Sequence, residues 1–146
     1  RLALPPTPES FGALLSLSRE HHTSLVMARD ARRAANEKDA AALSIMLARM
    51  ETHWHTLLAA HFEQEERLMR VAEDTLDPES VARILAEHGE LQMLASGPCT
   101  LEPTERLRRF GDLLGAHVRY EERVFFSQLK SHPCVAAVAT DMDAQV

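Results

Sequence analysis

Two short segments of the sequence repeat the same residue types at the same spacing. Residues 61–68 read HFEQEERL and residues 117–124 read HVRYEERV, so each has a histidine, a glutamate four positions later, a second glutamate and an arginine. In an α-helix, side chains four positions apart lie on the same face. Each segment is therefore expected to direct one imidazole and one carboxylate toward the same point. The two pairs are His61 with Glu65 and His117 with Glu121.

Two other segments also contribute histidines. Residues 19–25 read REHHTSL and residues 86–91 read AEHGEL, and both contain a Glu-His step and a leucine three positions after a histidine. The matching histidine and leucine pairs are His22 with Leu25 and His88 with Leu91. The chain therefore carries histidines on four separate segments, and two of these segments add a glutamate at matched spacing.

This distribution of side chains is typical of a metal site. A single histidine on an apolar helix face is usually a hydrogen-bonded core residue, and a Glu-Glu-Arg run is usually a solvated face. Four imidazoles and two carboxylates buried together are different, because without cations their unpaired groups would be strongly unfavourable. Imidazole and carboxylate without thiolate suit iron, manganese or zinc. Carboxylates from two helices can each bridge two ions, and the histidines are then terminal ligands.

Helices must position these residues. Apolar residues follow a helical period along almost the whole chain, and no segment shows the alternation of a strand. An Asp77 cap followed by Pro78, and Pro103 after a Gly-Pro turn, predict two helix starts. We predict an all-α fold with a single domain over residues 1–146, an up-down-up-down four-helix bundle with a metal site in its core. The expected helices cover about 9–35, 39–73, 78–96 and 103–130, followed by a short C-terminal tail.

Composition and charge exclude several classes of protein. The 146 residues are 45% apolar and 26% charged, as in ordinary globular chains, and the formal net charge is −6. A nucleic-acid partner would need clustered Lys and Arg, so none is expected. No apolar run approaches the roughly 18 residues of a membrane span, and the first residues lack the regions of a signal peptide. We therefore expect a cytoplasmic protein that does not associate with a membrane.

At these motifs the sequence resembles the hemerythrin-like proteins, also called the HHE cation-binding domain family. The resemblance covers nearly all of the chain, from LSREHHTSL through AAHFEQEERLM and ILAEHGEL to LLGAHVRYEERVFF. The family's fold is a four-helix bundle with a non-heme di-iron centre that meets dioxygen or related small molecules. The resemblance thus implies two iron ions as cofactor, with manganese or zinc as alternatives, and a small diatomic or peroxide ligand.

The resemblance also implies which residues bind the metal ions. The ligand on the first helix falls on His22 or His21, and we prefer His22 because its spacing to Leu25 repeats that of His88 to Leu91. Glu122 is an alternative to Glu121, because the family's oxygen carriers have an Asp five positions after the last histidine. The implied ligands are His22, His61, Glu65, His88, His117 and Glu121.

One departure from the oxygen carriers affects the expected function. These carriers have a second histidine four positions after the third-helix ligand, and here that position is Gln92. Four histidines in place of five argue against reversible oxygen carriage and resemble members tied to sensing, iron homeostasis or repair. We therefore expect a di-iron binding protein in sensing, iron homeostasis or stress response, compatible with an oxidase- or peroxidase-like side activity. The alternatives are an iron donor or repair protein, and a helical interaction module whose histidines hold a structural metal.

Three nearby residues each have two expected roles. Glu66 and Glu122 are expected to be solvated partners of neighbouring arginines, or to hydrogen-bond metal-bound histidines, which usually require an outer partner. His53 is expected at the exposed surface or at the edge of the core, with an approach to the metal ions as the alternative.

Overall fold

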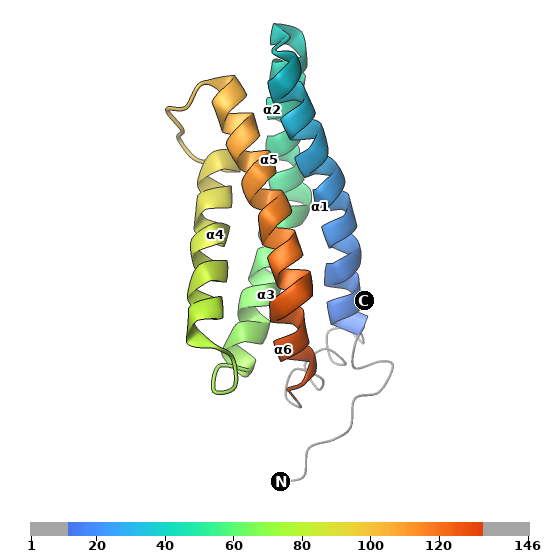
Figure 1. Ribbon diagram of the computed structural model, residues 1–146, viewed down its shortest axis with the longest axis vertical. Helices are drawn as coiled ribbons and strands as arrows, with labels where there is room; N and C mark the ends of the chain where they lie inside the picture. Colours follow the sequence, from blue (N-terminus) through green and yellow to red (C-terminus); the bar gives the residue numbers. More distant parts are fainter. Residues whose placement is uncertain (1–11, 133–146) are drawn as a thin grey trace.

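A computed structural model describes residues 12–132, and every regular element in that range is helical (Figure 1). The prediction of an all-α chain is therefore confirmed for these residues. None of the helices in this range is both long and apolar enough to cross a membrane. The elements are α1 (Gly12–Glu37), α2 (Ala40–His53), the π-helical η2 (Trp54–Leu58), α3 (Ala59–Val71), α4 (Pro78–Ser96), α5 (Pro103–Tyr120), the π-helical η3 (Glu121–Phe125) and α6 (Phe126–Lys130).

These elements form four long helical segments that lie side by side along the molecule (Figure 1). Elements α2, η2 and α3 follow one another without a break and make the second segment, and α5, η3 and α6 make the fourth. The predicted helices over 39–73, 78–96 and 103–130 correspond closely to the last three segments. The predicted start of the first helix at residue 9 and the predicted C-terminal tail beyond residue 132 lie outside the described residues.

The helix starts follow from local side-chain chemistry. The Asp39 carboxylate accepts a hydrogen bond from the Ala42 backbone N–H at 2.9 Å, and it caps α2. The Asp77 carboxylate accepts from the Ser80 N–H at 3.2 Å, and Pro78 occupies the first turn of α4. Between α1 and α2 the chain turns within two residues, because Lys38 takes a left-handed conformation with φ of 57°.

The apolar core is divided into two clusters, one on each side of a polar layer. On α1, Leu14 and Leu17 belong to one cluster and Met27 and Ala28 to the other. The same division recurs on α3, α4 and the fourth segment. The buried polar side chains of α1 between the two clusters are His21, which is 3% exposed, and Ser24, which is 1% exposed. The two apolar clusters therefore enclose a layer of buried polar side chains at one level of the bundle.

The closest helix packing joins two of the segments that reach this polar layer. Elements α1 and α5 form the most extensive helix pair. At Gly111 of α5, a Cβ atom would lie 2.8 Å from the Ala28 carbonyl oxygen and 2.7 Å from Cγ of Arg32, so only glycine allows this approach. The Arg32 guanidinium donates a hydrogen bond to the Gly111 carbonyl at 2.9 Å. The spacing between α1 and α5 is thereby closely defined.

Candidate metal centre

Six buried side chains meet in the polar layer between the two apolar clusters. One comes from α1, two from α3, one from α4, one from α5 and one from the first position of η3. None is more than 4% exposed. They are His21, His61, Glu65, His88, His117 and Glu121.

The two carboxylates occupy the middle of this cluster and each contacts histidines from two helices. Glu65 Oε2 lies 3.1 Å from His61 Nε2, and Glu65 Oε1 lies 3.0 Å from His88 Nε2. Glu121 Oε1 lies 2.9 Å from His21 Nε2 and 3.3 Å from His117 Nε2. All four imidazoles therefore direct Nε2 toward the carboxylates.

The ligand-type atoms fall into two overlapping groups. In each group, one atom from each of four residues lies within 4.8 Å of the others. The first group is His21, His61, Glu65 and Glu121, and the second is Glu65, His88, His117 and Glu121. Both groups contain both carboxylates and two imidazoles each, so if each group held an ion, the two carboxylates would be shared between the ions.

Five of the six ligand residues expected from the sequence lie in this cluster, but His22 does not. The His22 side chain is exposed, whereas His21 is buried and contacts Glu121. The preference for His22 is therefore corrected to His21. Adjacent residues lie about 100° apart around a helix, so only one of the pair can face the interior.

The structure also distinguishes the adjacent glutamates of each repeated motif. Glu65 and Glu121 are fully buried, while Glu66 and Glu122 are 37% and 41% exposed. Glu66 and Glu122 lie outside the cluster and contact the outer ring nitrogen of a cluster histidine. Glu66 contacts Nδ1 of His88, and Glu122 contacts Nδ1 of His21. Two further outer carboxylates, Glu20 and Glu87, were not singled out from the sequence, although each is the glutamate of a Glu-His step.

Mutual contacts strongly perturb the pKa values of the cluster. Burial alone would lower the pKa of His21, but hydrogen bonds and charge from Glu121 and Glu65 raise it to about 10. The same opposition raises the pKa of His88 to about 10 and that of His61 to about 9. Burial alone would raise the pKa of Glu65, but the neighbouring imidazoles hold it well below its usual range. The protein without metal is therefore stabilised by imidazolium–carboxylate pairs.

These pairs leave part of the cluster unsatisfied. Among the described side chains, His117 Nε2 and Glu121 Oε2 are buried N and O atoms without a hydrogen-bond partner. Both belong to the second ligand group, and both are atom types that bind a divalent or trivalent cation. Buried polar atoms without a partner are rare in folded proteins. The orphaned atoms and the donor set therefore fit a metal ion at this position.

A cavity of about 380 Å³ reaches the cluster at His88. Its walls come from η2, α3 and α4, and they include Trp54, Phe62 and Gln92. The Phe62 ring stacks on the His88 imidazole with the ring centroids 3.8 Å apart. Gly89 adds no side chain, and a Cβ atom there would have no neighbour within 4 Å. Gln92, which lies one helical turn after His88, therefore faces the same cavity.

His53 lies outside both ligand groups. It is 9% exposed, and its Nε2 atom lies 3.1 Å from the Ser24 hydroxyl of α1. Burial, together with the charges of Arg49 and His61, lowers the pKa of His53 to about 4. His53 is thus a neutral, buried residue near the core edge, which agrees with one of its two expected positions.

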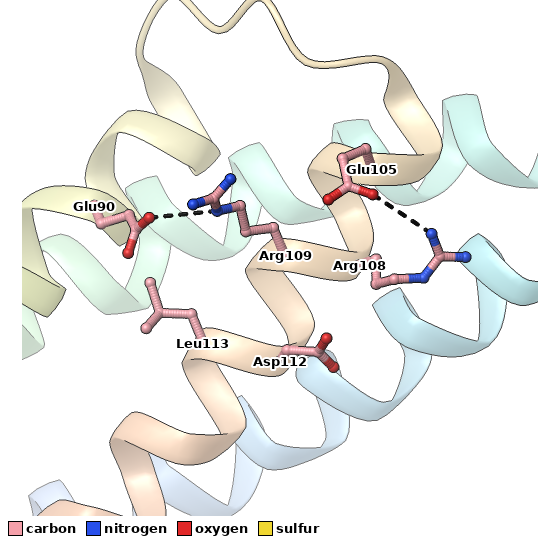
Figure 2. Close-up of a pocket in the computed structure, with 6 residues that line it drawn as sticks. All are labelled: Glu90, Glu105, Arg108, Arg109, Asp112 and Leu113. Carbon is pink, nitrogen blue, oxygen red and sulfur yellow. Dashed lines mark ion pairs between the residues drawn. The ribbon is translucent and has the colours of Figure 1, made fainter.

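A second hollow lies on the surface of α4 and α5 and does not include any residue of the cluster (Figure 2). Figure 2 shows that four of its five charged side chains form two ion pairs, which join Arg109 to Glu90 at 3.4 Å and Arg108 to Glu105 at 3.6 Å. Exposed ion pairs of this kind contribute little to the stability of a protein. The side chains of this hollow also do not converge on a common point as ligands would. We assign no site to this hollow.

Comparisons with known proteins give no match for this chain. No protein-family model matches it, and no curated protein or solved structure matches it. The functional assignment therefore depends on the sequence motifs and on the geometry of the His/Glu cluster.

Proposed function

We propose that this protein is a non-heme di-iron protein of the hemerythrin-like type, with an up-down-up-down bundle, which binds or reacts with dioxygen or a related small molecule. The single observation that carries the proposal is the pair of buried ligand groups that share Glu65 and Glu121. A structural ion pair network needs no such sharing, whereas a binuclear centre does. We further propose a role in sensing, iron homeostasis or stress response.

The ligand types suit iron, which the resemblance implies, with manganese as the alternative. Each ion position offers two imidazole nitrogens and two shared carboxylate oxygens. Mixed nitrogen and oxygen sets without thiolate suit iron and manganese, and an incomplete set leaves coordination positions for a small molecule. Zinc prefers a closed tetrahedral site in a structural role. A carboxylate-bridged pair of positions beside a cavity is therefore better suited to redox chemistry than to structural zinc.

Bound iron would supply the electrons for reaction with dioxygen or a peroxide. The chain's own residues supply access and confinement. Trp54 and Phe62 give the cavity an apolar wall, and Gln92 offers a neutral amide where an oxygen carrier has an imidazole. A weak ligand at this point leaves room for an incoming molecule next to His88.

The proposal is tested by metal content. The protein, purified without an affinity tag and reconstituted with excess Fe(II) under anaerobic conditions, should bind about two iron ions per chain. Glu65→Ala should lose both ions together, because Glu65 contacts histidines of both ligand groups. The control is Glu63→Ala, an exposed glutamate on the same helix, which should keep both ions. A native protein that retains one iron or none would contradict the di-iron proposal.

The same iron-loaded protein distinguishes the alternatives. Its absorption spectrum should change on exposure to air and should not revert cleanly when the gas is removed. A protein that as purified holds only zinc, and whose iron-loaded form shows no spectral change in air, would instead support a structural metal site. A long-lived oxygenated form that reverses on degassing would support an oxygen carrier.

A further inference from the structure

The Nδ1 atom of every cluster histidine contacts a carboxylate from outside the cluster. The four distances fall between 2.7 and 2.9 Å. In each case the carboxylate belongs to a different helical segment from the histidine. The pairs are Glu20 with His61, Glu66 with His88, Glu87 with His117 and Glu122 with His21.

Taken in order, these contacts close into a ring around the bundle. The glutamate of α1 contacts the histidine of α3, and the glutamate of α3 contacts the histidine of α4. The glutamate of α4 contacts the histidine of α5, and the glutamate of η3 contacts the histidine of α1. The ring also repeats with a twofold pattern. In α1 and α4 the outer glutamate directly precedes the histidine, and in the other two segments it lies five positions after the histidine. Chance surface pairs would show neither the closure nor the repetition.

Each contact constrains the chemistry of the opposite ring nitrogen. When a carboxylate accepts a hydrogen bond from Nδ1–H, the neutral imidazole carries its lone pair on Nε2, and its ring orientation is fixed. All four Nε2 atoms point at the two central carboxylates. We propose that Glu20, Glu66, Glu87 and Glu122 are positioning residues, which form a closed ring of hydrogen bonds between helices that holds the four imidazoles ready to bind metal. This inference rests on the proposed metal-binding function.

Two of the outer carboxylates are themselves held in place. Glu87 is 15% exposed and accepts a hydrogen bond from Arg83 Nε at 3.2 Å. Glu122 accepts from the Ser18 hydroxyl at 2.9 Å. A carboxylate that is fixed by a third group loses less freedom when it orients an imidazole. These supports are expected if the carboxylates serve to orient the histidines.

The ring predicts an effect that crosses from one helix to the next. Removal of the Glu66 carboxylate should disturb His88 on α4 and leave His61, on the same segment as Glu66, in place. Removal of the Glu122 carboxylate should disturb His21 on α1 and leave His117 in place. A residue that only stabilised its own helix would not show this pattern.

The experiment uses Zn(II) as a diamagnetic probe with ¹⁵N-labelled histidine. In the zinc-loaded native protein, NMR should show four Nδ1–H signals that exchange slowly with water. Glu66→Ala should remove or shift the His88 signal alone and weaken zinc binding by about 10–100-fold. Glu66→Gln keeps an acceptor oxygen, so it should retain the His88 signal and most of the affinity. Glu63→Ala is the matched control on α3, and Glu122→Ala tests the symmetric prediction at His21.

The outcomes separate this inference from the proposed function. Failure of the native protein to bind either zinc or iron overturns the metal-binding function and the positioning role together. Native binding with all four signals and unchanged affinity in Glu66→Ala and Glu122→Ala overturns the ring alone. A variant that alters all four signals equally would show a general structural role, which also overturns the ring.

Discussion

The two ring nitrogens of each cluster histidine face carboxylates on opposite sides, and this determines what the ring can bind. Nε2 faces a buried carboxylate of the cluster and Nδ1 faces an outer one, as at His21, which lies between Glu121 and Glu122. Without metal, such an imidazole is stable as a cation with two N–H donors. A metal ion bound as we propose would take the place of the proton on Nε2. Metal and protons would therefore compete for the same four nitrogen atoms.

The adjacent histidines of α1 provide the sharpest test at the scale of single residues. His21→Ala should weaken iron binding by more than about 10–100-fold, which is the loss typical for removal of an outer partner. The reason is that this variant removes a proposed ligand itself. His22→Ala changes only an exposed side chain and should keep about two iron ions per chain. Metal analysis after equilibrium dialysis measures both variants. Full iron in His21→Ala with loss in His22→Ala would reverse the assignment.

The spacing of the buried residues along α1 distinguishes His21 from His22. The buried positions of α1 alternate in steps of three and four, through Leu14, Leu17, His21, Ser24 and Ala28. The spacing from His22 to Leu25 favoured the wrong residue, because Leu25 is only half-buried and the polar Ser24 takes the inner position. The Glu-His step shared by Glu20-His21 and Glu87-His88 carried the correct signal. The other five expected residues all lie in the cluster, and of the two glutamates left open after His117 the buried one is Glu121, four positions later on the same helix face.

At the scale of elements, helix boundaries were far more predictable than helix geometry. Asp77 and Pro78 begin α4 as expected, and Pro103 begins α5. The two π-helical segments were not predicted, because a π turn needs no glycine or proline and shifts the apolar pattern by one residue only. Both lie next to the site, since η2 precedes His61 by three residues and η3 begins at Glu121. Such segments often occur at functional sites.

The close approach of α1 and α5 gives a prediction about stability. Gly111→Ala should lower the free energy of unfolding by about 1–3 kcal/mol, because the new methyl group meets the Ala28 carbonyl oxygen and the helices must separate. Gly89→Ala is the matched control, since nothing lies within 4 Å of its Cβ position. It should gain up to about 1 kcal/mol from helix propensity. Urea unfolding of the metal-free proteins measures both changes, and a stabilised Gly111→Ala would contradict the described packing.

At the scale of the whole molecule, the protonation of the cluster links stability to pH. The pKa values of His21 and His88 are raised to about 10 and that of His61 to about 9, from 6.5. Because the folded-state values are raised, the stabilisation is complete below pH 6.5 and is lost as pH rises toward 10. The stability of the metal-free protein should therefore fall at alkaline pH.

Thermal unfolding at several pH values with a chelator present tests this prediction. The melting temperature of the metal-free protein should fall by about 5–10 °C between pH 7 and pH 10, given about 3 °C for each kcal/mol in a chain of this size. With metal bound, Nε2 carries no proton to lose, so the fall should be much smaller. Identical pH profiles with and without metal would contradict the imidazolium–carboxylate account of the cluster.

The twofold repetition of the ring has a consequence for any molecule that reaches the two proposed ion positions. Each ligand group has two histidines and both buried glutamates, so residue types alone would make the two positions equivalent. Their surroundings differ, because His88 forms part of the cavity wall, whereas neither His21 nor His61 lines that cavity. A small molecule that enters through the cavity would therefore reach the ion position at His88 first, although the two positions have the same ligand types.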